Sequence, residues 1–222
     1  TEDIAKFISE HKILVGVSVD GTEGMFNDYR KSKDDKPVFH KVVNSFKLLK
    51  QYGVQVGISC TLNPAVVDNF KEVVDFLIAL GVENGLAFNI LHETPGLDVP
   101  YEYYQKAADF IIKAFQLFRE KGIYEERFMR KLQSFVKQEP IFSDCSATGN
   151  QIVVAPDGSV GVCQDFIKIK KYFPANVYND NWDPFDDPVF NGWKQRSPLN
   201  MEQCFLCPAL GICGGGCPAS IE

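Results

Sequence analysis

The chain's 222 residues suit one large domain or two small ones, and a hydrophobic fraction of 45% excludes intrinsic disorder. A net charge of −6 gives no electrostatic reason to expect nucleic-acid binding. No apolar run approaches the length that crosses a membrane, so we expect a soluble, cytoplasmic protein with neither a membrane nor a nucleic-acid partner.

The first half of the chain alternates between helical patterns and short apolar runs. An amphipathic helix is expected at residues 2–8, and another helix at 124–137. Helical patterns that end at a glycine cover residues 39–52, 69–80 and 101–121. Apolar runs typical of strands buried on both faces cover residues 13–19, 54–60 and 86–91. The alternation predicts an α/β fold with three parallel βα units.

Polar side chains follow each of the three predicted strands, where parallel sheets gather their functional residues. The segments are Ser18–Gly21, Ser59–Asn63 and Asn89–Glu93, the last of which contains His92. Loops are ordinarily polar too, so the pattern alone is equally typical of a structural rim. Three strands leave both edges of a sheet open, and we expect further strands upstream of Thr1, with both ends of the chain cut.

The second half of the chain contains a hairpin signature between two cysteines. Residues 151–155 and 160–163 flank a Pro-Asp-Gly-Ser turn and predict two antiparallel strands. Cys145 precedes the first strand and Cys163 ends the second, so the two thiols can act as one ligand group. A short helix is expected at residues 188–195, and its two aromatic residues are more typical of core than of a shield around a metal site.

Four cysteines then follow with the spacing C-x2-C-x5-C-x3-C, namely Cys204, Cys207, Cys213 and Cys217. The odd total of seven cysteines argues against a closed set of disulfides. The spacing is tight for zinc and closer to the iron–sulfur run C-x2-C-x2-C-x3-C-P. Iron–sulfur ligation is therefore favoured, with zinc and disulfides as open alternatives. Cys60 lies on a predicted strand and is interpreted as a small core residue.

The six cysteines from Cys145 to Cys217 resemble the seven-cysteine SPASM motif of the radical SAM peptide and protein maturases. The first half is similar to the later part of the radical SAM barrel in the same enzymes, on the residues of Ser18–Gly21, Gly57–Asn63 and Phe88–Leu91. The resemblance implies a partial (β/α) barrel with three parallel βα units over residues 1–122. A small α+β SPASM domain with a β-hairpin and cysteine-rich loops, truncated at its end, is implied over residues 123–222.

The resemblance also implies particular site residues. Two auxiliary [4Fe–4S] clusters are implied, one on Cys145, Cys163 and Cys217 with an open iron, and one on Cys204, Cys207 and Cys213 with a later cysteine. Contacts to S-adenosyl-L-methionine are implied for Ser18, Asp20, Arg30, Thr61, Asn63, Ile90 and Leu91. Asp165 is the candidate catalytic base, with His92 and Glu93 as weaker candidates. In the sulfatase maturases this Asp directly follows the cysteine, whereas here Gln164 intervenes.

The implied parent protein is a radical SAM oxidoreductase, a maturase that modifies a ribosomal peptide or a protein and receives electrons from a ferredoxin or flavodoxin. The C-x3-C-x2-C motif that cleaves S-adenosyl-L-methionine in this family is absent from the sequence, so we expect this chain alone to be inactive. One alternative is an anaerobic sulfatase maturase that makes formylglycine; Gln164 and the lack of a cysteine between Cys145 and Cys163 count against it. Another is a non-enzymatic iron–sulfur or zinc-binding module.

Overall fold

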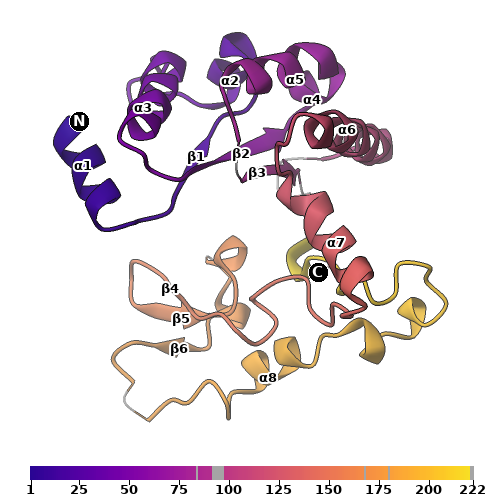
Figure 1. Ribbon diagram of the computed structural model, residues 1–222. Coiled ribbons are helices and arrows are strands. Elements are labelled where there is room, and N and C mark those ends of the chain that lie inside the picture. Colours follow the sequence, from indigo (N-terminus) through magenta and orange to yellow (C-terminus); the bar gives the residue numbers. More distant parts are fainter. Residues whose placement is uncertain (84, 92–97, 168, 180, 221–222) are drawn as a thin grey trace. The chain divides into compact units, whose positions relative to one another are not determined.

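The computed structural model (Figure 1) describes residues 1–83, 85–91, 98–167, 169–179 and 181–220. The chain divides into two compact units, Thr1–Arg130 and Lys131–Glu222. The division falls inside helix α7 (Glu126–Lys137), whereas the sequence placed a domain boundary after residue 122. The domain names attached to that boundary stay predictions, and each unit is described by itself.

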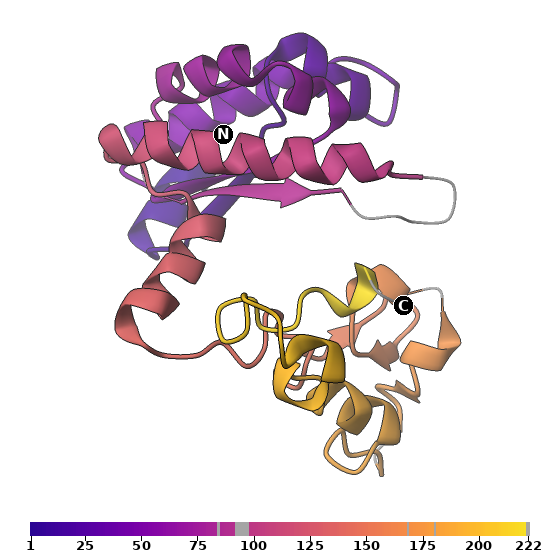
Figure 2. The same ribbon diagram turned by 90° about the vertical axis from the view of Figure 1, so that its right-hand side faces the viewer.

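The first unit contains a parallel sheet of three strands in the order β1-β2-β3, which confirms the three predicted βα units. Its strands are β1 (Val15–Ser18), β2 (Val56–Leu62) and β3 (Leu86–Ile90). Its helices before α7 are α1 (Glu2–Glu10), α2 (Glu23–Tyr29), α3 (Phe39–Gln51), α4 (Pro64–Asp68), α5 (Phe70–Ala79) and α6 (Tyr101–Glu120). Figures 1 and 2 show α2 to α6 over one face of this sheet.

The sequence did not predict α2 and α4, because each has only one or two turns. Helix α4 has clear start signals nonetheless. Asn63 is its N-cap, with the side-chain oxygen accepting from the Val66 amide at 3.0 Å, and Pro64 occupies the first turn. Helix α2 begins after Thr22 and places Met25 and Phe26 in the core. Both follow a strand directly and carry the chain away from its carboxyl end.

The two faces of the sheet differ in chemistry. The side chains that face the helices are apolar and include Val17, Ile58, Cys60, Leu62, Leu86 and Phe88. The alternate positions carry small or polar residues that are partly exposed, among them Ser18, Gly57, Ser59, Thr61, Ala87 and Asn89. The prediction of burial on both faces is therefore wrong for this second face. Glycine, alanine, serine and threonine interrupt the apolar runs too weakly to reveal a period of two.

The core of the first unit is built from large apolar side chains. Phe88 packs against Phe110 and Phe118, with ring centroids 5.2 and 6.1 Å apart. Cys60 is fully buried in this core, which confirms its interpretation as a core residue. Burial, and then the charge of Asp20, raise the pKa of Cys60 to about 12. Its thiol therefore stays protonated at neutral pH.

The second unit has an antiparallel sheet of very short strands in the order β4-β5-β6. They are β4 (Val153–Val154), β5 (Ser159–Gly161) and β6 (Ala175–Asn176). The predicted hairpin is confirmed, with shorter strands, and β6 was not predicted. Gly158 closes the turn at φ +83°, and the Ser159 amide donates to Asp157 at 2.9 Å, which lowers the pKa of Asp157.

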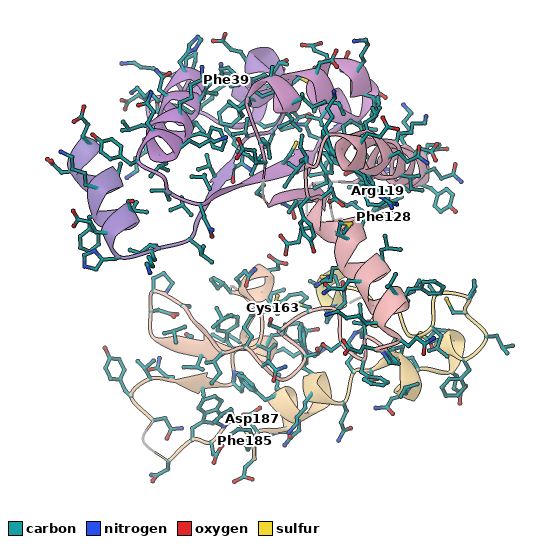
Figure 3. All side chains as sticks on the ribbon, in the orientation of Figure 1. Phe39, Arg119, Phe128, Cys163, Phe185 and Asp187 are labelled. Atoms are coloured by element: carbon teal, nitrogen blue, oxygen red, sulfur yellow. The ribbon has the colours of Figure 1, made fainter. Side chains whose placement is uncertain are left out.

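The remaining regular elements of the second unit are helical. The predicted short helix is α8 (Pro188–Lys194), capped by Asp187, which is labelled in Figure 3. The 3₁₀ turns cover Gln164–Phe166, Lys170–Tyr172, Pro198–Asn200, Glu202–Cys204 and Pro218–Ser220. Phe190 and Trp193 of α8 are buried in the core, as the sequence indicated. In the described residues of both units, no helix is long and apolar enough to cross a membrane.

Candidate cofactor-binding sites

Asp20 joins the carboxyl ends of the first two strands in the first unit. It is buried, and its carboxylate accepts from the Thr61 amide at 2.7 Å and forms an ion pair with the Nε of Arg30. Ser18 is paired with Ser59 in the parallel register of β1 and β2. The structure thus brings together three predicted site residues, and Asp20 fixes the position of the Arg30 guanidinium at this edge of the sheet.

Tyr103 of α6 joins the carboxyl ends of the second and third strands. Its hydroxyl donates to the Leu62 carbonyl at 2.6 Å and accepts from the Leu91 amide at 2.8 Å. Burial raises the pKa of Tyr103. The predicted site residues Ile90 and Leu91 are partly buried against the core. The amide oxygen of Asn63, another of the predicted residues, is used as the α4 cap.

A cavity of about 370 Å³ opens beside these residues, lined by Tyr29, Pro64, Val67, Asp68, Leu91, Asp98, Val99, Pro100, Glu102, Tyr103 and Lys106. Its walls are mainly apolar, and Lys106 and Asp68 form an ion pair of 2.7 Å at its edge. Among the predicted rim residues that the structure describes, only Leu91 lines this cavity. His92 and Glu93 lie outside the described residues.

A polar network on the second face of the sheet was missed by the sequence reading. Arg127 donates from Nε to the Phe88 carbonyl at 2.5 Å, and Asn89 donates to the Ser59 hydroxyl at 2.6 Å. Glu125, fully buried, accepts from the amides of Arg127 and Phe128 at 3.1 and 2.7 Å. Burial raises the pKa of Glu125, and these hydrogen bonds oppose the rise. An acidic residue just before a helix was the available signal.

In the second unit, backbone hydrogen bonds bring the first cysteine beside the last cysteine loop. The Ile141 amide donates to the Gly211 carbonyl at 2.6 Å, and the Asp144 amide donates to the Gly214 carbonyl at 3.0 Å. Lys131 forms an ion pair with Asp144 and donates to the Cys213 carbonyl at 2.8 Å. Segments about 70 residues apart in sequence are therefore held side by side.

Glycine makes this approach possible. Gly214 has φ +74°, and a Cβ there would lie 2.6 Å from the Asp144 amide nitrogen. Gly215 and Gly216 also have positive φ, at +82° and +73°. Only glycine adopts such a run without strain. The Gly-Gly-Gly segment thus lets the chain turn tightly between Cys213 and Cys217 while it contacts Asp144.

Cys163 has two other cysteines for neighbours. It is buried in the core of the second unit, where it is labelled in Figure 3, and Cys145 packs against the same core. Burial raises the pKa of Cys163, and the charges of Asp165, Cys145 and Cys217 raise it further. A backbone hydrogen bond from Asp165 opposes this rise. The other two predicted ligands of the first cluster thus both act on the pKa of Cys163.

The other three predicted ligands lie on consecutive tight turns. The Cys207 amide donates to the Cys204 carbonyl, and the Cys213 amide donates to the Ala209 carbonyl, both at 3.0 Å. Cys207 and Cys213 are exposed. Among the described residues, no three His, Cys, Asp or Glu side chains form a compact metal-binding group as they stand. Thiols are the donors that iron–sulfur clusters take, so both cysteine sets fit such clusters in chemistry.

Asp165, the predicted catalytic base, is exposed on the 3₁₀ turn that follows Cys163. Its charge raises the pKa of Cys163, and a hydrogen bond from its backbone lowers it. Gln164 is exposed beside it. With Gln164 inserted, Asp165 lies on the turn that begins at Cys163.

Known proteins match nearly the whole chain, although no family model matches it. The chain is 30% identical over 233 residues to a cysteine-type anaerobic sulfatase-maturating enzyme of Clostridium perfringens, covering 97% of the chain and 61% of that protein. It is 40% identical over 253 residues to a serine-type enzyme of Bacteroides thetaiotaomicron, covering 98% of the chain and 58% of that protein. This chain is related to the radical SAM maturases.

A solved structure of such a maturase gives the same result for the fold. The structure of anSMEcpe with bound AdoMet and Cp18Cys peptide has a TM-score of 0.78 and 25% identity, and the match covers 98% of this chain and 63% of that one. The chain therefore spans about 60% of the length of the maturases it matches. Their α/β fold confirms the predicted parallel units as part of a radical SAM fold.

Proposed function

We propose that this chain is the part of a radical SAM maturase that holds two auxiliary [4Fe–4S] clusters and one side of the S-adenosyl-L-methionine pocket. The observation that carries the proposal is the cysteine arrangement. Six thiols have the SPASM spacing, and Cys145 packs against the core that buries Cys163. The segment just before Cys145 is joined to the loop of the Gly-Gly-Gly turn by backbone hydrogen bonds rather than by disulfides, and all seven cysteines are free.

In this proposal Cys145, Cys163 and Cys217 hold one cluster, and Cys204, Cys207 and Cys213 hold the other. Such clusters supply a one-electron carrier whose potential depends on nearby charge and on exposure to solvent. The protein's own contribution is to bury Cys163 among aromatic side chains, which excludes water from that side. The second set is more exposed, and we place it nearer to an electron donor such as a ferredoxin or flavodoxin.

The edge of the parallel sheet supplies the S-adenosyl-L-methionine contacts in the proposal. Asp20 holds the Nε of Arg30, so the other guanidinium nitrogens remain to bind a carboxylate. The Ser18 hydroxyl and Thr61 lie on the same partly exposed face and provide further polar contacts. Asn63 keeps its amide nitrogen for the ligand while its oxygen caps α4. Ile90 and Leu91 supply the apolar wall.

For the parent reaction we propose the oxidation of a peptide or protein substrate, with sulfatase maturation as the first candidate. The named relatives are cysteine-type and serine-type sulfatase-maturating enzymes, and one was solved with a bound peptide. Asp165 is the proposed base because it is an exposed carboxylate on the turn that begins at Cys163. The sequence contains no C-x3-C-x2-C motif, so this chain by itself would not cleave S-adenosyl-L-methionine.

The second candidate is the maturation of a ribosomal peptide, the function that the sequence placed first. The observation that favours it is local. Gln164 separates Cys163 from Asp165, and no cysteine lies between Cys145 and Cys163. Both features depart from the sulfatase-maturase pattern, and they lie where a substrate-specific difference would have the largest effect.

Anaerobic reconstitution of the 222-residue chain with iron and sulfide tests the shared premise. We expect about eight irons per chain and charge-transfer absorption at about 400 nm, as two [4Fe–4S] clusters require. A parallel sample with zinc serves as the competing arm. Tight stoichiometric zinc binding without iron uptake would reject the iron–sulfur assignment and leave a zinc module. Intermolecular or internal disulfides formed in preference to either metal would reject both.

A further inference from the structure

Arg196 has two buried nitrogen atoms without a hydrogen-bond partner. Across the residues that the structure describes, its Nε and Nη2 are the only buried side-chain nitrogen or oxygen atoms in this condition. These two nitrogens lie on the same edge of the planar guanidinium, so their N–H groups point in parallel. The Arg196 guanidinium, which is always charged, therefore has two parallel N–H donors without a hydrogen-bond partner.

Such an arrangement is unfavourable unless something accepts both hydrogens. Buried donors that lose water without gaining a partner destabilise a folded chain, and a charged donor does so most. Native proteins leave few such groups, and each one calls for an explanation, such as a redox role or an ion or water that accepts its hydrogens. The open edge of Arg196 has the geometry to bind an anionic group through two hydrogen bonds.

The position of Arg196 narrows the identity of that partner. Arg196 follows α8, and its amide donates to the Trp193 carbonyl at 3.1 Å. Trp193 belongs to the core that holds Cys163, where it packs on Phe166 and Tyr172 at centroid distances of 5.8 and 5.7 Å. On this side Arg196 therefore lies next to the aromatic residues of the core that contains Cys163. Cys163 is one of the first cysteine set, which also includes Cys145 and Cys217.

The other side of Arg196 meets the last cysteine. Arg196 and Pro218 line the same cavity of about 310 Å³, and Pro218 directly follows Cys217. A Cβ on Gly215 would lie 3.4 Å from Pro198, so the chain just after Arg196 also contacts the Gly-Gly-Gly turn.

We propose that Arg196 donates its Nε–H and Nη2–H groups to the sulfur atoms of the cluster bound by Cys217, and thereby raises the reduction potential of that cluster. This inference rests on the proposed function, because it requires a cluster on the first cysteine set. One electron from dithionite converts [4Fe–4S]²⁺ to [4Fe–4S]⁺ without making or breaking a bond, and the guanidinium stabilises the added negative charge.

A redox titration of the reconstituted chain with dithionite, followed by electron paramagnetic resonance, tests the proposal. We expect Arg196→Met to lower the reduced-to-oxidised ratio of one cluster about tenfold at a fixed potential, a shift of about 59 mV for one electron. Arg196→Lys keeps the positive charge but lacks the two parallel N–H donors. It should shift the reduction potential of the same cluster by less than Arg196→Met does. Lys194→Met removes an exposed charge from the end of α8, two residues before Arg196, and should leave both potentials unchanged.

Chemical denaturation of the cluster-free chain provides the second readout. If Arg196 awaits a cluster, Arg196→Met should be as stable as the unsubstituted chain or more so without iron, because an unpaired buried charge is removed. A variant that is less stable without iron and normal in potential would overturn the proposal in favour of a packing role. A further contrary result is that acetate stabilises the cluster-free chain but not Arg196→Met, while the variant keeps normal cluster potentials. That result would overturn the proposal and assign the Arg196 donors to a carboxylate ligand instead. Failure of the unsubstituted chain to bind iron would reject the proposed function, and this inference with it.

Discussion

Each of the two units of this chain is stabilised internally by a different kind of interaction. The first has a parallel sheet covered by helices and a core of fully buried Phe, Leu, Ile and Val side chains. The second has strands of two or three residues and a small core that includes Cys163, and its loops are joined by backbone hydrogen bonds at glycines. Burial of apolar surface can stabilise the first unit alone, whereas a domain as sparse as the second usually depends on metals or cross-links.

The largest difference between the two units is expected when one buried cysteine is replaced in each. Cys163 and Cys60 are both buried cysteines, but only Cys163 has thiol neighbours. We expect Cys163→Ala to lose roughly half of the reconstituted iron and to abolish the extra protection that iron gives the second unit. Cys60→Ala should keep all the iron and cost the first unit about 1 kcal/mol from a small cavity.

Iron analysis and hydrogen exchange resolved by unit measure both effects. The comparison of the two units fails if Cys60→Ala lowers the iron content as much as Cys163→Ala does. It fails equally if amide protection in the second unit is the same with and without iron.

Adding one methyl group at the Gly-Gly-Gly turn should have the next largest effect. Gly214→Ala forces an Ala to φ +74° and places its Cβ 2.6 Å from the Asp144 amide nitrogen. The strain of such a backbone conformation is of the order of 1–3 kcal/mol. We expect this loss in the free energy of unfolding of the second unit, together with weaker iron binding, because the contact between Asp144 and the turn places Cys145.

The matched substitution is Gly192→Ala in α8, where a Cβ meets nothing within 4 Å. Alanine in a helix is more favourable than glycine by roughly 0.5–1 kcal/mol, so this variant should be as stable as the unsubstituted chain or slightly more stable. Denaturant unfolding monitored by Trp fluorescence compares the two, since both tryptophans are in the second unit. Equal stability of both variants would show that the turn does not fix the cysteine group.

The same contrast explains what the sequence could predict. Long apolar periods located every strand and most helices of the first unit, because burial there follows a regular repeat. The repeat did not show that one face of the sheet is polar, since the alternate residues are small. In the second unit, the spacing of the cysteines and the Pro-Asp-Gly-Ser turn located the hairpin, but β6 has two residues and no period at all.

The candidate sites divide in a similar way. Cysteine spacing named all six candidate ligands, because cysteine is a rare residue whose recurrence at motif spacing is readable from the sequence. Tyr103, Arg127 and Arg196 act through contacts with residues that are distant in sequence, and no local pattern marks them. Asp20 was expected to contact the cofactor directly; it is bonded to Arg30 and to the Thr61 amide, contacts that only the register of β1 and β2 reveals.

The smallest expected effect is a pH dependence confined to the first unit. Burial raises the pKa of Glu125 above its ordinary value of 4.5 in the folded chain only. Below that value the carboxyl is protonated in both states, and its contribution to stability is fully present. As the pH rises, the unfolded chain ionises first, so the free energy of unfolding falls until the folded carboxyl has also ionised, with a slope of at most about 1.4 kcal/mol per pH unit.

Glu125→Gln should remove this slope in the first unit above pH 4.5, because the amide does not titrate, although its single oxygen can accept from only one of the Arg127 and Phe128 amides. Glu126→Gln changes the exposed neighbour on the same helix and should leave the slope as it is. Urea unfolding of the cluster-free chain from pH 4 upward measures both variants. An unchanged slope in Glu125→Gln would mean that water or the amides of α7 fully offset the burial. The first unit would then tolerate a charged Glu125 without loss of stability. The two units would then differ only in how their side chains pack.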